Sequence, residues 1–457
     1  MGKTAFKQAI ERAIPAAACF AAAAVIVAVP ARAQPSQALV WCANKSGLFS
    51  PEVAINGCTI TIEAGQETPK ILALAYNNRG LAYADKGDLD QAIADYSEAI
   101  KRDPGLVLAY VNRGLVYTDK HDPGQALADF SEAIRLDPKF ALAFTARGNA
   151  LLDAKDYDHA LVDYTEAIRL DPKLAIAYHN RGHAFRGAGS IERAIANFSE
   201  AIRLDPNYRD AYQSRGLAYV TKGELDRAIA DFGEAIRLDP KFASALGGRG
   251  SAFEAKKDYV GAFADLDKAV AAQPDNAESR NLRGHVRYAM GELDRAIADY
   301  GDAIRLDPKF AAALMNRGLA YEGKGDYGRA VADFDAASRL TPTDVNVWNS
   351  RCWARAVGGQ ELEQAAADCS EAVKLAPDNA DVIDSRAFVY LKLGDLDSAI
   401  GDYNTALRLD PKLVSSLYGR GIARQRKGDS AGGGADMAAA RAARPTIGEE
   451  FAVYGIK

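Results

Sequence analysis

The sequence predicts an all-α solenoid of about eleven helix-turn-helix repeats, and two periodic features carry the prediction. An Arg residue, usually followed by Gly, recurs at ten intervals, nine of 34 residues and one of 35. Prolines follow the same period. A fixed period of this length is the signature of a repeat architecture. The recurring Arg residues are Arg79, Arg113, Arg147, Arg181, Arg215, Arg249, Arg283, Arg317, Arg351, Arg386 and Arg420.

One repeat runs from Asp210 to Pro240, and its first half predicts a helix. Tyr212, Gly216 and Tyr219 are four and three residues apart, so they fall on one helix face. Gly223 can adopt the left-handed backbone that ends a helix. We therefore expect a first helix that ends at Gly223 and has a small residue in the middle of its buried face.

The second half of the same repeat predicts a second helix. Ala228, Phe232 and Ala235 share one face, and the acidic stretch from Glu224 to Asp226 suits a helix N-terminus. The pair Asp239–Pro240 is expected to open the next helix, with the carboxylate as cap and the proline in the first turn. In three other repeats an Asp after Gly is expected to cap the second helix: Asp88, Asp326 and Asp395.

These positions resemble the tetratricopeptide repeat (TPR) family over residues 70 to 447. The resemblance implies a right-handed superhelix whose helix pairs gain stability by stacking on their neighbours. It also implies that the first helices line a concave surface that binds other proteins, often as extended peptides. The extra residue of the ninth repeat falls between Val357 and Gln360, and residues 448–457 form a tail that can cover the last helix.

Arg stands before the small residue in all eleven repeats, where the family usually has Leu. Arg215 is three residues after Tyr212, on or beside the buried face, and Asp231 has the same relation to the face of the second helix. Asp recurs at the place of Asp231 in every repeat except one, which has Asn197. We expect each Arg to pair with such an Asp, in its own repeat or the adjacent one. Alternatively, the Arg side chain lies along the edge and its head reaches water.

The first 33 residues have the pattern of a secretory signal peptide. Basic residues precede an apolar run from Ala13 to Val29, and Ala31 to Ala33 offers a small-residue cleavage site. The alternative is an uncleaved membrane anchor, which would be the only membrane contact. We expect export to the bacterial periplasm.

Four cysteines follow residue 33, and an oxidising compartment would allow them to pair. Cys42 and Cys58 lie in the only segment outside the repeats, residues 34–69, which is predicted to be a cap held by a disulfide. Cys352 replaces the close-contact glycine and Cys369 the facing aromatic residue of one repeat, which predicts a second disulfide. The alternative for Cys352 and Cys369 is two buried free thiols.

Asn or Ser often precedes the recurring Arg. These residues resemble the asparagine ladder of the TPR superhelix of O-linked N-acetylglucosamine transferases, in which amides hold a peptide backbone. An amide offers a donor and an acceptor to any main chain. The alternative is solvated helix surface. The predicted groove residues are Asn78, Asn112, Asn180, Ser214, Asn316, Ser350 and Ser385.

No motif for catalysis is found in the sequence. His179 and His183 are four residues apart and could share a metal, but a third ligand is not evident, so they are interpreted as groove histidines rather than a metal site. We expect no enzyme activity, no catalytic residue and no cofactor. The net charge of −5 gives no support for a nucleic-acid partner.

The sequence thus predicts a scaffold or adaptor of the bacterial envelope that binds segments of partner proteins in its concave groove. The alternative is an accessory subunit of an envelope enzyme, or of polysaccharide synthesis or export machinery. The partner's identity and the oligomeric state are not encoded in any motif of the chain.

Overall fold

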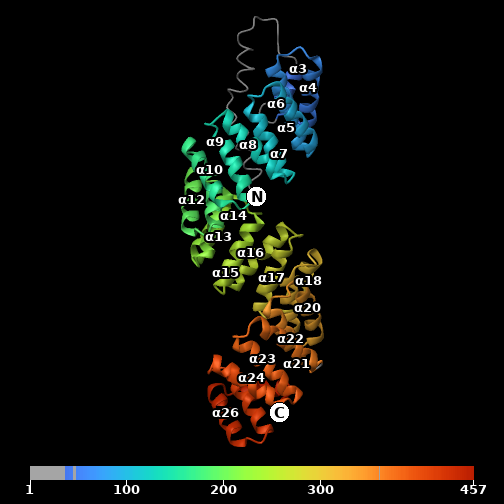
Figure 1. The fold of residues 1–457 in the computed structure, drawn as a ribbon, viewed down its shortest axis with the longest axis vertical. Coiled ribbons are helices and arrows are strands. Elements are labelled where there is room, and N and C mark those ends of the chain that lie inside the picture. The colour runs from blue at the N-terminus through green and yellow to red at the C-terminus, as the bar shows by residue number, and fades with distance from the viewer. Residues whose placement is uncertain (1–36, 45–47, 360, 457) are drawn as a thin grey trace. The chain divides into compact units, whose positions relative to one another are not determined.

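The computed structural model describes residues 37–44, 48–359 and 361–456. Every regular element within these ranges is an α-helix, 25 in all, which confirms the predicted all-α class (Figure 1). The predicted signal peptide, residues 1–33, lies outside the described residues. Within the described ranges, none of the helices combines the length and the hydrophobicity that a membrane span requires.

The chain forms two compact units, residues 1–239 and 240–457. The first contains α3 and α4 followed by five helix pairs. Their bounds are α3 Gln37–Ala43, α4 Pro51–Ala64, α5 Pro69–Lys86, α6 Leu89–Arg102, α7 Val107–Asp119, α8 Pro123–Leu136, α9 Ala141–Asp153, α10 Tyr157–Leu170, α11 Ala175–Gly187, α12 Ile191–Leu204, α13 Arg209–Thr221 and α14 Leu225–Leu238.

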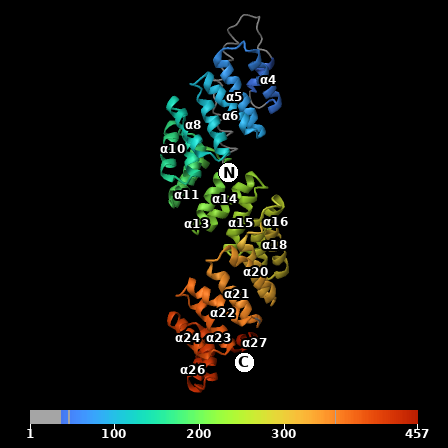
Figure 2. The same cartoon turned by 45° about the vertical axis from the view of Figure 1, so that its right-hand side comes forward.

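The second unit contains six helix pairs and a short final helix. Their bounds are α15 Ala243–Ala255, α16 Tyr259–Ala272, α17 Ala277–Ala289, α18 Leu293–Leu306, α19 Ala311–Gly323, α20 Tyr327–Leu340, α21 Val345–Gly358, α22 Leu362–Leu375, α23 Ala380–Leu393, α24 Leu396–Leu409, α25 Val414–Arg426, α26 Ser430–Ala443 and α27 Ile447–Val453. Within each unit, every pair packs on the next pair along the chain (Figures 1 and 2). The eleven pairs match the predicted repeats.

The two helices of a repeat meet where the sequence places a small residue opposite a large one. A Cβ atom added to Gly216 would come within 2.8 Å of the ring of Phe232, so only glycine fits there without a shift of the ring. Ala228, Phe232 and Ala235 are fully buried. The same contact recurs in other repeats, for example between Gly318 and Phe334. Burial of these faces is the main source of stability for helices of only 13 or 14 residues.

The turn between the helices agrees with the prediction, because Gly223 has a positive φ of 75°. The Asp residues that follow such glycines differ from one another. Asp326 and Asp395 accept a hydrogen bond from the backbone N–H three residues later, as predicted for caps. The prediction was wrong for Asp88, whose side chain makes no capping bond.

The predicted role of Asp239–Pro240 as a helix start is also wrong. Asp239 is the C-cap of α14, and α15 begins only at Ala243. The equivalent Asp137 shows the reason. Its side chain accepts from the N–H of Lys139, and its carbonyl accepts from the N–H of Phe140. Asp followed by Pro is therefore the start of a tight turn, which satisfies the carboxylate before the next helix begins.

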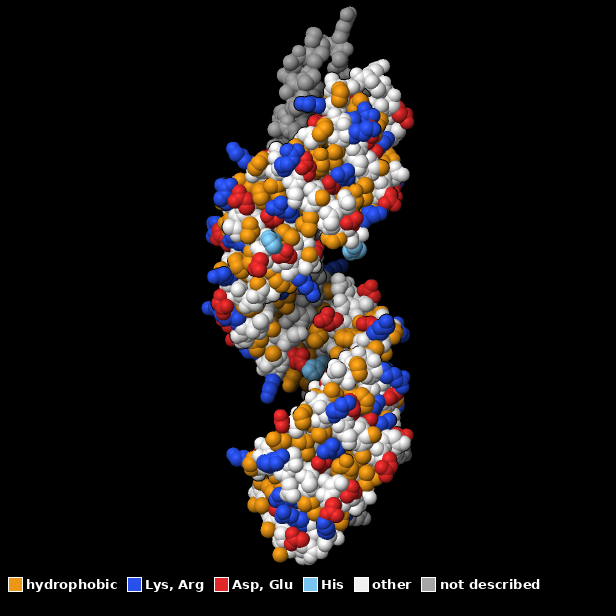
Figure 3. Space-filling view, in the orientation of Figure 1, with side chains coloured by type: hydrophobic (Ala, Val, Ile, Leu, Met, Phe, Trp, Pro, Cys, Tyr) orange, Lys and Arg blue, Asp and Glu red, His pale blue; other side chains and the backbone are white. Residues whose placement is uncertain are grey.

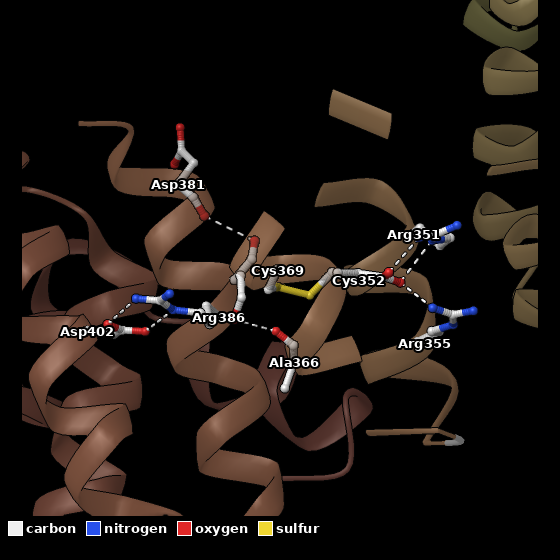
Figure 4. Close-up of a disulfide and its surroundings, with 11 residues drawn as sticks. Arg351, Cys352, Arg355, Ala366, Cys369, Asp381, Arg386 and Asp402 are labelled. Atoms are coloured by element: carbon white, nitrogen blue, oxygen red, sulfur yellow. Dashed lines mark hydrogen bonds and ion pairs between the residues drawn. A yellow bond between two sulfur atoms is a disulfide. The ribbon is translucent and has the colours of Figure 1, made fainter. Parts of the chain in front are cut away.

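Both predicted cysteine pairs lie at disulfide distance. Cys42 of α3 and Cys58 of α4 have Cα atoms 4.4 Å apart, and this pair joins the two helices of the N-terminal cap. Cys352 of α21 and Cys369 of α22 have Cα atoms 5.3 Å apart and are fully buried (Figure 4). This second pair occupies the place where glycine meets an aromatic ring in other repeats.

Candidate functional site

The recurring Arg and Asp side chains form paired hydrogen bonds inside all but one of the repeats. In ten repeats the Arg Nε and Nη2 groups donate to the two carboxylate oxygens of one Asp, at 2.6–3.0 Å. Arg215 and Asp231 are one such pair. The partner is always in the same repeat, and a bidentate pair of this kind fixes the orientation of both side chains. The Arg head therefore does not simply reach water.

The remaining Nη1 group often connects the Arg to the preceding repeat. Arg113 donates to Ser97, and Arg215 donates to Ser199, each at 2.9 Å. A carboxylate takes this place for Arg283, which donates to Asp267 at 2.7 Å. One guanidinium thus links three helices: its own, its partner helix, and the second helix of the repeat before.

Three Arg residues that replace the second aromatic residue of the repeat strengthen the same pairs. Arg287, Arg355 and Arg424 each donate through Nη1 to the Asp that already binds the recurring Arg. Figure 4 shows Arg351 and Arg355 near the Cys352–Cys369 pair, and both arginines donate to Asp368. These departures add a second guanidinium to a buried carboxylate.

The fourth repeat lacks the carboxylate. Arg181 Nε donates to Asn197 Oδ1 at 2.8 Å, and Asn197 Nδ2 donates to the carbonyl of Arg193. Burial lowers the pKa of Arg181, whereas the hydrogen bond to Asp231 raises the pKa of Arg215. Arg181 is therefore a half-buried cation next to a neutral amide.

The predicted groove residues lie between successive first helices. Asn112, Asn180, Ser214 and Ser385 are only 6–7% exposed, and Asn78, Asn316 and Ser350 are half-buried. Three of the asparagines donate to an amide of the preceding repeat at 2.8–3.0 Å: Asn112 to Asn77, Asn180 to Asn149, and Asn316 to Asn281. We call the four predicted groove residues of the first unit, Asn78, Asn112, Asn180 and Ser214, the amide row. Each of the three links uses one N–H of the donating amide. In Asn180 the oxygen is also occupied, because it lies 3.2 Å from His179 Nδ1.

His179 and His183 belong to a hydrogen-bonded cluster with Ser214. His179 Nδ1 faces Asn180 Oδ1, an acceptor, so Nδ1 carries the proton. His183 Nδ1 faces Arg186 Nη2, which can only donate, so His183 carries its proton on Nε2. The two Nε2 atoms are 3.2 Å apart, and Ser214 Oγ is 3.1 Å from each.

This arrangement explains the two histidines without a metal. A metal on both Nε2 atoms would move the proton of His183 to Nδ1, against the N–H of Arg186. Burial lowers the pKa of His179 to about 4 and that of His183 to about 2, so both rings are neutral at pH 7. The side chain of His179 is buried to the same degree as those of the neighbouring groove residues Asn180 and Ser214. Groups of three or more metal-binding side chains are not found among the described residues.

The final helix covers part of the first-helix face in the second unit. Phe451 of α27 contacts Phe388 of α23 and Tyr418 of α25, with ring centroids 5.8 and 5.0 Å apart. Tyr454, at the end of α27, contacts Trp353 of α21. Lys392 Nζ donates to the carbonyls of Ala356 and Tyr454. The tail therefore lies across three repeats, not only over the last helix.

A cavity of about 260 Å³ remains under α27, and the predicted groove residue Ser385 lines it. This groove residue of the second unit is therefore covered by the chain itself. A larger hollow of about 520 Å³ lies at the turn from Ala376 to Ala380. It is open to solvent and brings no cluster of functional side chains together.

Sequence families described as tetratricopeptide repeat or TPR repeat match most of the chain. The matched residues are 73–106, 107–140, 148–189, 182–223, 214–277, 281–345 and 387–428. None of the curated proteins compared with the chain matches it.

Several solved structures are similar to this chain. A tetratricopeptide repeat protein from Parabacteroides merdae is 20% identical, with a TM-score of 0.44 over 54% of this chain and 97% of its own. MamA is 32% identical, with a TM-score of 0.33 over 36% of this chain and 96% of its own. YrrB, described as a TPR protein with an unusual peptide-binding site, is 24% identical, with a TM-score of 0.34 over 40% of this chain and 95% of its own.

Proposed function

This chain belongs to the tetratricopeptide repeat family, and from that premise we propose that it is a scaffold or adaptor of the bacterial envelope that holds extended segments of partner proteins. Repeat proteins of this kind act through extended surfaces built by stacked units. The proposal assigns the chain no catalytic residue and no cofactor.

The observation that carries the proposal is the amide row on the first helices of the first unit. Asn112 is bonded to Asn77 and Asn180 to Asn149, so the orientation of both amides is fixed before a partner arrives. Leu217 and Val220 of α13 are exposed beside the row. Amides of fixed orientation can bind the main chain of a peptide, and the exposed apolar side chains beside them can contact its side chains. Such a surface suits a peptide that is bound with little sequence specificity.

The surface charge supports a protein partner rather than nucleic acid. On the face in view in Figure 3, Lys and Arg side chains are interspersed with Asp and Glu. A nucleic-acid site would need basic side chains gathered in one stripe.

The place in the envelope is supported by the cysteines and by the start of the sequence. Two cysteine pairs at disulfide distance are compatible with an oxidising compartment. Residues 1–33 have the pattern of a signal peptide. Alkylation of the purified periplasmic protein under denaturing conditions should label none of the four cysteines before reduction and all four afterwards.

The test of the function is site-specific photo-crosslinking in cells. A photoreactive residue at Leu217, 36% exposed on a first helix, should capture envelope proteins. The matched control is Val162, which is more exposed, at 66%, but lies on the second helix α10. Capture from Val162 and none from Leu217 would contradict the proposal. Capture of one enzyme or export component only would favour the accessory-subunit alternative.

A further inference from the structure

The cavity under α27 combines a charged group with aromatic walls. Its lining includes Asp384 and Phe388 of α23, Tyr403 of α24, Trp353 of α21 and Phe451 of α27. A single water needs only about 10–15 Å³ of such space, so about 260 Å³ holds considerably more. Two features of this repeat, the carboxylate of Asp384 and the hydroxyl of Tyr403, are found here.

The first feature is Asp384, which stands two residues before the recurring Arg and is the only acidic residue at that position in the eleven repeats. At the same place in other repeats, Asn77 and Asn281 accept a hydrogen bond from the asparagine of the next repeat. Here the next repeat has Gly419 at the donor's position, so no side chain can reach Asp384 from there. The hydroxyls of Ser415 and Ser416 bond to the carboxylate instead. No basic side chain forms a salt bridge with Asp384 among the described residues.

The second feature is the hydroxyl of Tyr403. The equivalent Tyr164 donates from its hydroxyl to Asn149, at 2.8 Å. The residue at the place of Asn149 is Phe388, which cannot accept. The hydroxyl of Tyr403 is therefore buried without a hydrogen-bond partner in the described part of the chain. A buried polar group in that state costs free energy unless a ligand or water satisfies it.

The walls of the cavity are rings. Trp353 and Phe388 have centroids 5.1 Å apart, and Phe388 and Phe451 have centroids 5.8 Å apart. Ring faces attract cations, and they also receive alkyl groups. An anion would meet the charge of Asp384, and a neutral apolar ligand would leave the Tyr403 hydroxyl without a partner.

We propose that this cavity binds a small organic cation with a primary ammonium group. The N–H groups of the cation donate to the carboxylate of Asp384 and to the hydroxyl oxygen of Tyr403. Its alkyl part packs against Trp353, Phe388 and Phe451. This site is distinct from the peptide-binding face of the first unit and does not depend on it.

Charges of both signs lie around the cavity. Lys392 Nζ is 5.8 Å from the ring centroid of Phe388, and it donates to the carbonyls of Ala356 and Tyr454. Arg444 pairs with Glu450 at 3.0 Å, so these two charges offset each other. Asp381 adds a second acidic side chain to the lining. Burial raises the pKa of Asp384 to about 6, so the carboxylate is mainly charged at pH 7.5. Burial and the charge of Asp384 raise the pKa of Tyr403 well above its usual value, which keeps the phenol protonated.

The experiment compares n-butylammonium with 1-butanol on the full-length protein at pH 7.5, by saturation-transfer NMR and calorimetric titration. The two probes differ only in the charged donor group. Butylammonium should bind at least about tenfold more tightly than butanol, the difference expected for hydrogen bonds to a charged group. Equal binding of the two probes, or no binding of butylammonium, would overturn the proposal.

Two variants locate the site. Asp384→Asn should weaken butylammonium binding by about tenfold or more, whereas Asp397→Asn, which removes an exposed carboxylate from the same repeat, should not change it. Tyr403→Phe removes only an unpartnered hydroxyl, so it should fold at least as well as the natural protein and still weaken binding severalfold. Unchanged binding in both Asp384→Asn and Tyr403→Phe would show that the amine binds elsewhere.

Discussion

At the scale of single residues, burial of the Arg–Asp pair has a desolvation cost, and the hydrogen bonds of the pair offset that cost. A guanidinium beside a buried helix face must lose water, and this cost is recovered only when every donor finds an acceptor. In Arg215 each of the three guanidinium nitrogens makes a hydrogen bond, because Nε and Nη2 bond to Asp231 and Nη1 bonds to Ser199. The rings of Tyr212 and Tyr219 lie within about 6 Å of the same guanidinium. The pair therefore specifies how the two helices of a repeat align.

Removal of one partner should be costly. In Arg215→Ala, the side chain of Asp231, only 8% exposed, loses its counter-charge, which should lower the free energy of unfolding by about 3–5 kcal/mol. The matched control is Arg227→Ala, because Arg227 is 68% exposed and pairs with Glu224 on the surface. Urea denaturation followed by circular dichroism would measure both. Equal midpoints for the two variants would contradict a structural role for the pair.

The fourth repeat offers the opposite experiment. Asn197→Asp gives Arg181 the carboxylate that the other ten repeats have, with almost no change in shape. We expect the variant to gain stability by about 1–2 kcal/mol, the value of a hydrogen bond to a charged group, and its thermal midpoint to rise. The reverse change, Asp231→Asn, should lower the midpoint. A lower thermal midpoint for Asn197→Asp would contradict this prediction and would mean that the neutral amide has another structural role.

At the scale of helices, α11 differs from its equivalents because it contains two neutral histidines. Ser214 Oγ of α13 lies within hydrogen-bond distance of both His179 and His183. The cluster therefore joins two successive repeats through imidazole rings that must remain uncharged. Tyr208 contributes a further hydroxyl at 3.1 Å from His179 Nδ1. The contact between these two repeats therefore depends on protonation, whereas an Asn–Asn link does not.

Acid should weaken this contact. An unfolded histidine binds a proton below a pH of about 6.5, whereas the folded rings remain neutral down to about 4 for His179 and about 2 for His183. Between pH 6.5 and 4 the unfolded chain binds more protons, so the stability of the first unit is complete above pH 6.5 and falls as the pH decreases. Urea midpoints measured across this range should show the decline.

The control for the pH experiment is a double variant, His179→Gln with His183→Gln, which has no titrating ring at either position. Its midpoint should change less between pH 6.5 and 4 than that of the natural protein. An identical slope in both proteins would assign the acid sensitivity to other groups.

At the scale of the whole molecule, the sequence was enough to predict the helix pairs, because the same spacing of small and large residues is found in successive repeats. It was also enough to place Arg215 opposite Asp231 and Cys352 opposite Cys369. It did not distinguish a turn from a helix start at Asp239–Pro240, since both use a carboxylate before proline. The burial of Asn112 and His179 was missed, because their partners lie in the neighbouring repeat. The cavity under α27 depends on residues 353 to 454 and has no local signal.

Deletion of residues 447–457 should expose the face that α27 covers in the second unit. Ile447 and Phe451 are almost fully buried, and each contributes about 1.5–3 kcal/mol by burial. The shortened protein should melt at a lower temperature and bind the dye ANS more strongly, because Phe388 and Tyr418 lose their cover. Unchanged dye binding would contradict the observed position of α27. As a control, Val453→Ala changes an exposed residue of the same helix and should have no effect.

The position of each carboxylate sixteen residues after its guanidinium, or seventeen in one repeat, has a consequence for how such genes change. Duplication or loss of one complete repeat adds or removes both charges together, so no buried charge is left without its partner. A lineage could therefore lengthen or shorten its binding surface in single steps without an intermediate that fails to fold.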